Sequence, residues 1–299
     1  MSIRPPVICI GSVLWDIIGR TQGAVRERGD VAGRITRLPG GVAMNIAMTL
    51  AKLGMAPIML TALGRDFEGQ ELLSASRELG LNVDYVHQSN DLPTDTYMAI
   101  EDSDGVVAAI ADAHGLEAAG DAILAPLSDG RLASAAAPWD GLIVLDGNLT
   151  RPLLAQIAAS ALFARATLCV APASPGKAER LWPVMHHPRS TLYVNLHEAR
   201  LLCDRPFASS AEAAQGLVRA GATRALVTDG ARDASDAAAG RATVTLPARV
   251  VAARRVTGAG DTFMAAHIFA ESAGASPPEA LTRAQAAAAA YVAFEDTAR

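Results

Sequence analysis

The sequence predicts an α/β protein whose parallel sheet is covered by helices on both faces, giving a three-layer α/β/α body with a small β-sheet lid. Three observations lead to this fold. Short apolar runs alternate with helical patterns along the chain, as in parallel sheets. Two stretches interrupt that alternation in a way that indicates extra strands. No internal repeat or flexible linker divides the 299 residues, so we expect a single domain over residues 1–299.

The N-terminal half begins with a buried strand. This strand, Val7–Ile10, is followed by the turn-like pair Gly11-Ser12. Ala43–Leu53 has apolar residues at helical spacing and ends at Gly54, which suits the left-handed conformation that closes many helices. The next strand and helix are expected at Pro57–Ala62 and Gln70–Leu79.

The C-terminal half repeats the alternation of strand and helix. Its short apolar runs predict the strands Leu142–Leu145, Thr167–Val170, Leu192–Val194 and Ala225–Thr228. Ala- and Leu-rich helices are expected at Leu153–Phe163, Glu198–Leu202, Ala211–Ala220, Met264–Ala270 and Leu281–Phe294.

The two interruptions predict the lid. Ile17–Leu38 is polar, rich in Gly and Arg, and has no helical period. Thr96–Ile100 and Val106–Ile110 flank an Asp-Gly turn at Asp104-Gly105, the pattern of a β-hairpin. We therefore expect lid segments at about residues 12–39 and 94–112.

Composition excludes several classes of protein. The net charge is −5 and the pI about 5.7, so no basic field exists to hold nucleic acid. Mean hydropathy is +0.22, but the longest apolar run, Ala286–Phe294, is far shorter than the roughly 20 residues of a membrane span. The N-terminal apolar run is interrupted by Asp16 and lacks a signal-peptide cleavage pattern, so we expect a soluble, cytoplasmic protein. Three scattered cysteines, Cys9, Cys169 and Cys203, form no metal or disulfide pattern.

The most informative motif is the string Val256-Thr257-Gly258-Ala259-Gly260-Asp261-Thr262-Phe263, which opens a helix. Glycines at the start of a helix let backbone amides converge on an anion, so Gly258, Ala259 and Gly260 are candidates for a phosphoryl-binding anion hole. An aspartate repels such an anion, and it makes chemical sense as the general base that accepts a proton from an attacking hydroxyl. The alternative is that Asp261 only caps the helix. The string is neither a Walker A loop nor a dinucleotide-binding GxGxxG motif.

Other polar residues follow predicted strands or open helices where α/β sheets bind ligands. A second glycine pair, Gly40-Gly41, opens a helix that carries Asn45 in its first turn. Asp16, Asn195, Glu198, Thr228 and Gly230 come shortly after strands. Trp15, beside Asp16, is either a stacking partner for a nucleobase or a core residue. We expect the polar residues to share one crevice.

With these motifs the sequence resembles the ribokinase-like (PfkB) carbohydrate and nucleoside kinases over essentially its whole length. The matching residues are Gly40-Gly41 with Asn45-Ile46-Ala47 and Leu53-Gly54, then Gly64-Arg65-Asp66 and Gly69, the pair Asn195 and Glu198, and Thr257–Phe263. The resemblance implies a Rossmann-like body with a β-lid. It also implies ATP and Mg²⁺ as cofactors and transfer of the γ-phosphoryl group to a sugar hydroxymethyl group of a small-molecule nucleoside or sugar substrate. A homodimer is compatible with the family.

The resemblance also implies roles for individual residues. Asp261 is the base, and Asp16, Gly41, Asn45, Thr96 and Asn148 contact the acceptor. Asn195 and Glu198 organise Mg²⁺ and the nucleotide phosphates, Glu198 binding the metal through water. Thr228 and Gly230 contact the nucleotide.

Within the family the sequence is most similar to pseudouridine kinases, through the Asp16 segment, residues 94–112, Asp146-Gly147-Asn148 and Asn195–Ala199. Val42 stands where ribokinase usually has Lys. Arg254-Arg255 stands where cation-activated members have Asp, so no K⁺ requirement is predicted, and Asp233 replaces the last glycine of a TxGxxG nucleotide loop. Alternatives are a ribokinase- or fructokinase-like kinase for another sugar or nucleoside, and a catalytically silent sensor. An oxidoreductase would need GxGxxG after the first strand, which is absent.

Overall fold

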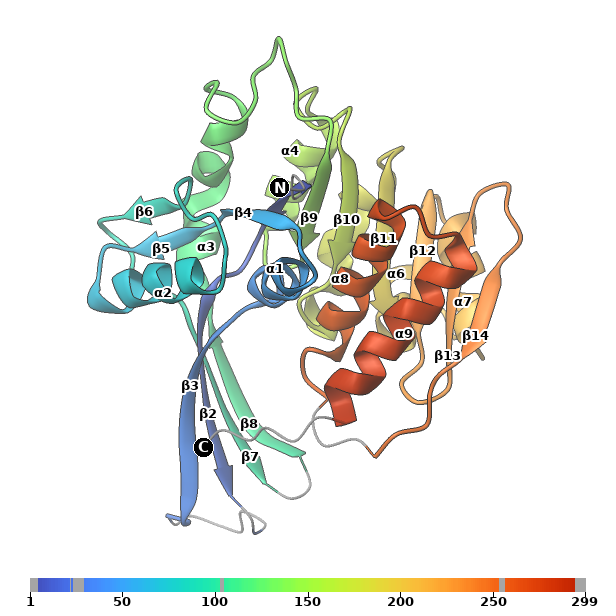
Figure 1. Cartoon of the computed structure of the whole chain (residues 1–299), viewed down its shortest axis with the longest axis horizontal. Helices are drawn as coiled ribbons and strands as arrows, with labels where there is room; N and C mark the ends of the chain where they lie inside the picture. The colour runs from blue at the N-terminus through green and yellow to red at the C-terminus, as the bar shows by residue number, and fades with distance from the viewer. Residues whose placement is uncertain (1–4, 22, 24–29, 103–104, 253–255, 294–299) are drawn as a thin grey trace.

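The computed structural model describes residues 5–21, 23, 30–102, 105–252 and 256–293 (Figure 1). Its centre is an eight-stranded sheet with the order β14-β13-β12-β11-β10-β9-β1-β4. The strands are β1 (Pro6–Ile10), β4 (Ala56–Leu60), β9 (Leu142–Asp146), β10 (Thr167–Ala171), β11 (Ser190–Asn195), β12 (Arg224–Thr228), β13 (Asp233–Ala238) and β14 (Val244–Pro247). The strands predicted from apolar runs are all present, each within two residues of its expected bounds.

The sheet is mixed, whereas the sequence predicted a parallel one. The pairs from β4 to β12 are parallel, but β13 and β14 run antiparallel at the edge. The sequence of β13, DASDAA, has low β-propensity, so periodicity did not identify it. Its strand conformation comes from pairing with β12 through a tight turn at residues 229–232.

Helices cover both faces of the large sheet, as predicted (Figure 1). Alternate residues of β1 show the two cores, since Ile8 and Ile10 pack with one helical layer and Val7 and Cys9 with the other. The layer on the Val7 side contains α1 (Val42–Lys52), α8 (Ala259–Ser272) and α9 (Pro277–Ala293). The opposite layer contains α4 (Arg151–Ala159), α5 (Trp182–Met185), α6 (Leu196–Cys203) and α7 (Ser210–Arg219) with the 3-10 helices η1 (Gly120–Leu127) and η2 (Pro175–Leu181). Two further helices, α2 (Phe67–Glu78) and α3 (His114–Ala119), lie beside the short parallel pair β5 (Ala62–Gly64) and β6 (His87–Ser89).

The predicted helices are all present, but α8 begins at Ala259 rather than at Met264, and the end of α4 also differs. Helix α4 ends at Ala159 rather than at Phe163, because Ser160 adopts an extended conformation with φ −81° and ψ 133°. Phe163 is buried all the same, in the turn that leads to β10. Its apolar character therefore reflects core packing outside a helix.

A second, four-stranded sheet with the order β3-β2-β7-β8 projects from the body (Figure 1). It consists of β2 (Leu14–Thr21), β3 (Gly33–Gly40), β7 (Thr96–Asp102) and β8 (Gly105–Asp112), and we call it the small sheet. Both interruptions of the alternation thus form strands of one sheet. The small β-sheet that the fold prediction adds to the body is confirmed.

Residue pairing gives the small sheet two different faces. Asp16 pairs with Tyr97, which pairs with Ala111, and these three side chains lie on the inner face. Neighbouring residues point the other way, so Thr96 and Met98 lie on the outer face.

Candidate active site

A cavity of about 630 Å³ lies between the carboxyl ends of the parallel strands and the inner face of the small sheet. Its lining contains most of the residues that the sequence analysis named as candidates for the site. These are Asp16, Gly41, Asn45, Asn148, Asn195, Glu198, Thr228, Gly258, Gly260 and Asp261. Parallel strands present their carboxyl ends at one edge, which is why residues so far apart in the chain meet here.

Asp261 lies in the first turn of α8, and its carboxylate Oδ2 accepts a hydrogen bond of 2.9 Å from the side-chain amide of Asn45 on α1. Burial raises the pKa of Asp261 to about 7, the Asn45 bond opposes that rise, and the charges of Asp146, Asp16 and Glu198 add to it. A carboxylate with a pKa near neutrality is well matched to accepting a proton from a hydroxyl group.

The turn before α8 places backbone amides at the same end of the cavity. Gly258 has φ +89°, a left-handed conformation that favours glycine, and it begins the helix without a side-chain cap. The Ala259 N–H donates to the Val256 carbonyl at 3.1 Å, and Ala259 does not line the cavity. Gly258 and Gly260 do line it, so these two residues present the glycine turn to a ligand.

Two further carboxylates enter the cavity from other elements. Burial raises the pKa of Asp16, on β2, to about 6. Glu198 forms a capping box with Asn195 at the start of α6, with bonds of 2.8 and 2.9 Å between side chains and backbone amides. Burial also raises the pKa of Glu198 to about 7, although its bonds with Asn195 oppose the rise.

Comparison with known proteins identifies the family to which this arrangement belongs. The model of the pfkB family of carbohydrate kinases matches residues 5–298. The chain belongs to this family. The resemblance inferred from the motifs is confirmed, and members of the family are phosphotransferases with an alcohol acceptor.

Individual relatives resemble this pfkB-family chain either over part of its length or at low sequence identity. Pseudouridine kinase of Escherichia coli K12 is 34% identical over 105 residues, which are 35% of this chain and 34% of that enzyme. The match therefore spans about a third of the length of that relative. A carbohydrate kinase from Agrobacterium tumefaciens has a TM-score of 0.80 and 26% identity, covering 98% of this chain and 92% of that one. Ribokinase of Arabidopsis thaliana, solved with ribose and ATP, has a TM-score of 0.76 and 22% identity, covering 98% and 94%. The fold is thus ribokinase-like.

Two predicted site residues of the pfkB-family chain lie away from the cavity. Thr96 points to the outer face of the small sheet, while Tyr97, one residue later, lines the cavity. Gly230 has φ +57° in the tight turn between β12 and β13 and does not line the cavity, whereas Thr228, paired with Asn195, does. Trp15 is a core residue whose Nε1 donates to the Glu68 carbonyl at 2.9 Å.

Sequence reasoning missed the residues that hold the loops of the site together. The fully buried Asp146 accepts hydrogen bonds from the backbone amides of Ser12, Ala43 and Asn148 and from the Ser12 hydroxyl, at 2.7 to 3.0 Å. It therefore joins the end of β1, the start of α1 and the end of β9. Gly41 packs against the same loop. Its φ of +99° favours glycine, and a Cβ at this position would lie only 2.5 Å from the Ser12 carbonyl oxygen.

Lys177, on η2, is a second residue that the motifs did not reveal. Its Nζ donates to Asn148 Oδ1 at 2.7 Å, and the Asn148 amide donates to the Ser12 hydroxyl at 2.8 Å. Burial and the neighbouring Arg180 lower the pKa of Lys177. Of the described residues that line the cavity, Lys177 is the one cation, against the carboxylates Asp16, Glu198 and Asp261. One of only two lysines in the sequence, it could have been noticed by composition alone.

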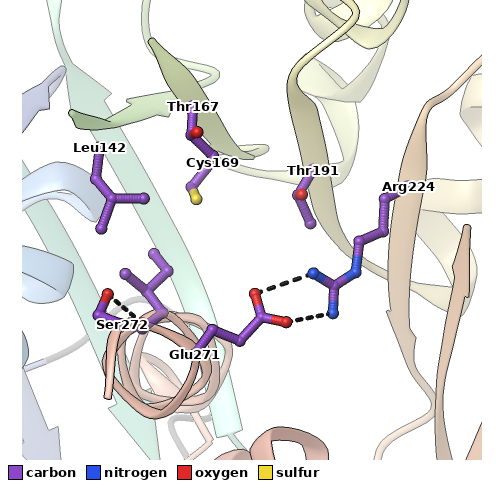
Figure 2. A pocket seen from close by; sticks show the side chains of 8 residues that line it. Leu142, Thr167, Cys169, Thr191, Arg224, Glu271 and Ser272 are labelled. Carbon is purple, nitrogen blue, oxygen red and sulfur yellow. Dashed lines mark hydrogen bonds and ion pairs between the residues drawn. The ribbon is translucent and has the colours of Figure 1, made fainter. Parts of the chain in front are cut away.

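A second cavity of about 360 Å³ lies at the opposite ends of the strands (Figure 2). Thr167 and Thr191 at strand starts line it, with Arg224 and Glu271 paired at 2.8 Å across it. None of the pfkB motif residues reaches this cavity. We therefore take the larger cavity as the candidate active site.

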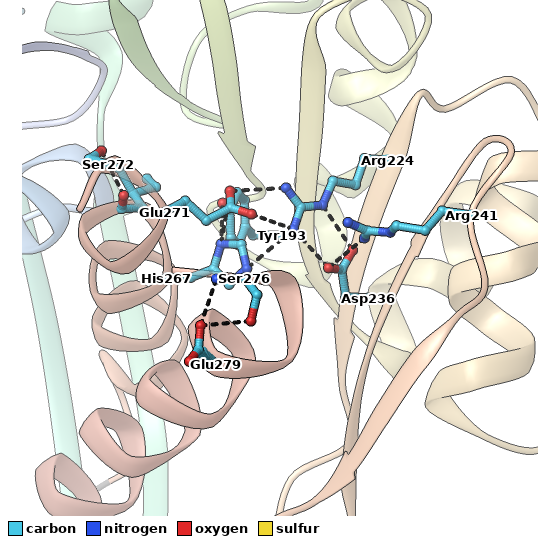
Figure 3. A network of polar contacts seen from close by, with 10 residues as sticks. Tyr193, Arg224, Asp236, Arg241, His267, Glu271, Ser272, Ser276 and Glu279 are labelled. Carbon is cyan, nitrogen blue, oxygen red and sulfur yellow. Dashed lines mark hydrogen bonds and ion pairs between the residues drawn. The ribbon is translucent and has the colours of Figure 1, made fainter. Parts of the chain in front are cut away.

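The same Arg224 belongs to a buried polar network that fixes α8 against the large sheet (Figure 3). Arg224 also pairs with the fully buried Asp236 of β13 at 2.7 Å. On α8, His267 contacts the Tyr193 hydroxyl of β11 at 3.0 Å, and burial lowers the pKa of His267 to about 4. These contacts hold the helix whose first turn carries Asp261.

No three His, Cys, Asp or Glu side chains converge as a metal-binding set among the residues that the structure describes. Arg254 and Arg255, on which the expectation about K⁺ depends, lie outside the described residues. In the described part of the chain, no helix is long and apolar enough to span a membrane.

Proposed function

We propose that this chain is an ATP-dependent kinase that transfers the γ-phosphoryl group to the 5′-hydroxyl of a nucleoside, with pseudouridine as its preferred acceptor. The observation that carries the proposal is Asp261 at the glycine turn of α8, in one cavity with Asp16 and Asn45. This arrangement supports the proposal, because a candidate base, a candidate phosphoryl-binding turn and groups able to bind ribose hydroxyls line one cavity.

In the proposed step, the acceptor 5′-hydroxyl gives its proton to Asp261 while its oxygen forms a bond to the γ-phosphorus of ATP. The bond between that phosphorus and the bridging oxygen breaks, and ADP leaves with the electron pair. The backbone amides of Gly258 and Gly260 stabilise the charge on the transferred group. Ala259 joins them only if its amide releases the Val256 carbonyl.

The cavity fits a divalent cation because it is rich in negative charge. ATP would add more negative charge to a lining that already contains three carboxylates and one lysine. Glu198 Oε2 accepts a hydrogen bond from the Asn195 backbone amide, and Oε1 has no hydrogen-bond partner among the described residues. We propose that Glu198 holds Mg²⁺ through water, with Asn195 and Thr228 beside the phosphates. When bound, the ion neutralises charge on the phosphates.

Two features support a nucleoside over a free sugar as the acceptor. Relatives named pseudouridine kinase, guanosine-inosine kinase and nucleoside kinase match about a third of this chain at 29–34% identity. Besides Asp16, the cavity is lined by Tyr97, Asn148 and Lys177, which provide an aromatic ring and polar atoms for a base. Pseudouridine has one more base N–H than uridine, and Asn148 Oδ1 can accept a second hydrogen bond beside that from Lys177.

The test is a coupled assay that compares pseudouridine, uridine and ribose under identical ATP-Mg²⁺ conditions. We expect the highest kcat/KM for pseudouridine, because uridine would leave a buried acceptor unpaired. If ribose or another free sugar is better by about tenfold or more, the pseudouridine assignment fails and the kinase assignment stands. If no sugar or nucleoside is phosphorylated but one binds, the chain is a sensor.

We also propose that the small sheet is a lid over the acceptor and that its outer face pairs with a second copy of the chain. Ile35, Met98, Ile100 and Ile110 lie on that face with exposed fractions of 78, 48, 45 and 70%. Covering them would remove apolar surface from water. Ile110→Glu should therefore convert a dimer into monomers in sedimentation, whereas Val250→Glu, at a residue that is 94% exposed in the loop after β14, should not. A wild-type chain that sediments as a monomer would contradict this prediction.

A further inference from the structure

Asn45 has a contact that a residue serving only to bind the acceptor would not need. Its side-chain Nδ2 donates a hydrogen bond of 2.9 Å to Oδ2 of Asp261, across the interface between α1 and α8. We infer that Asn45 is a positioning residue for the general base, which orients the Asp261 carboxylate and keeps it in the ionised form that can accept a proton. This inference rests on the proposed role of Asp261 and adds a residue that acts through it.

The geometry of the contact leaves one carboxylate oxygen for the reaction. Asn45 occupies Oδ2, and Oδ1 of Asp261 has no hydrogen-bond partner among the described residues. Since an amide N–H is a donor only, the bond defines which oxygen is already engaged before the acceptor arrives. A carboxylate held in one orientation loses less freedom when it meets the acceptor hydroxyl.

Asn45 is itself held firmly. Its backbone N–H donates to the Gly41 carbonyl at 2.8 Å, and Thr49 donates its hydroxyl to the Asn45 carbonyl at 2.9 Å. Two further hydrogen bonds fix the start of α1. The Val42 amide donates to the Ser12 hydroxyl at 2.9 Å, and the Ala43 amide donates to the Asp146 carboxylate at 3.0 Å. The donor therefore comes from a rigid helix rather than from a mobile loop.

The charges around Asp261 explain why such a donor is needed. Asp16 from β2, Asp146 from β9 and Glu198 from α6 are all acidic, and each raises the pKa of Asp261 on top of the effect of burial. Lys177, the cation in the lining, donates to Asn148 instead. Among the described residues, the Asn45 amide is the side-chain hydrogen-bond donor to Asp261. Without it, Asp261 would be more protonated at neutral pH and less able to act as a base.

The experiment measures the titration of Asp261 directly, by carbon NMR of carboxyl-labelled aspartate in the ligand-free protein, with Asp261→Asn to assign the signal. Asn45→Leu removes the donor, and we expect the pKa of Asp261 to rise by roughly one to two units. Asn45→Asp places a carboxylate against Asp261 and should raise it further. Gln156→Leu is the matched control, since this exposed amide on α4 donates to the Asp121 carboxylate at 3.3 Å and does not line the cavity, and it should leave the titration unchanged.

Kinetics supply the second readout. In Asn45→Leu the fall of kcat/KM on the acidic side of the pH profile should begin at a higher pH. If Asn45 only contacted the acceptor, its loss would raise KM and leave the pH profile unchanged. A titration of Asp261 within roughly 0.3 units of wild type in both Asn45 variants would overturn the inference. Because the NMR titration needs no acceptor, it decides this point even if the chain phosphorylates none of the compounds tested. Shifted titration with no activity would count against the proposed function alone.

Discussion

Asp261→Asn is expected to lower kcat about 10²- to 10⁴-fold, the usual range for loss of a general base. Asparagine has nearly the same shape but cannot accept the hydroxyl proton. The fold should survive, because the N-terminus of α8 has no side-chain cap at Gly258. Asp261 is therefore not needed to cap the start of this helix. Thermal unfolding of the variant should therefore stay close to that of wild type.

The measurement is steady-state turnover at saturating ATP and acceptor. Glu279→Gln serves as the control, because Glu279 also lies in the first turn of a helix, α9, but is outside the cavity. It should retain wild-type turnover. If Asp261→Asn kept turnover within about threefold of wild type, Asp261 could not be the base.

The pH dependence of the wild type follows from the same residue. Burial raises the pKa of Asp261 to about 7, so the base is increasingly protonated below that pH and kcat/KM should fall on the acidic side. Burial also raises the pKa of Glu198 to about 7 and that of Asp16 to about 6, and either could contribute to the limb. The residual activity of Asp261→Asn separates them, because the part of the limb that belongs to Asp261 must disappear with it.

Asp146→Asn should be the most damaging conservative change for stability. The Asp146 carboxylate accepts four hydrogen bonds and none of its surface is exposed. In the variant, an amide nitrogen replaces one of the two oxygens. It would face the backbone N–H groups of Ser12 and Ala43 in one orientation and that of Asn148 in the other, so buried donors would lose their acceptor. At about 1–3 kcal/mol for each unsatisfied group, we expect a loss of roughly 3 kcal/mol in the free energy of unfolding.

Chemical denaturation with urea measures this loss. Asp140→Asn is the matched control, since Asp140 is exposed and its ion pair with Arg165 spans 3.3 Å at the surface. Such a pair contributes little, so the control should unfold close to wild type. Equal stability of both variants would show that the Asp146 bonds are not needed to hold the loops of the site.

The sequence predicted the fold well because parallel strands buried on both faces are short, continuous apolar runs, such as that of β9. The strand β13 could not be predicted in this way. Its alternating Asp, Ala and Ser residues pair through backbone contacts with β12 and through the ion pair of Asp236 with Arg224. Such a strand is defined by its neighbours and not by its own composition.

The candidate site was predicted to the extent that its residues lie in recognisable motifs. Asp261, Asn45 and Glu198 share one cavity as expected. The difference between Thr96 and Tyr97 depends on strand register, and a shift of one residue exchanges the two faces of a sheet. Asp146 looks like any polar residue at the end of a strand, because its partner Ser12 is 134 residues away in the chain.

The small sheet is assembled from strands that are remote in sequence, and this has a consequence for how the protein folds. Its central pair β2 and β7 aligns Trp15 with Thr96, and the chain from β3 to β6 lies between these two strands in the sequence. Closing so long a loop costs entropy that only a preformed body can offset. We expect the small sheet to form after the large one and to unravel before it. The kinase would then lose the sheet that covers the proposed acceptor site at temperatures where the large sheet is still folded.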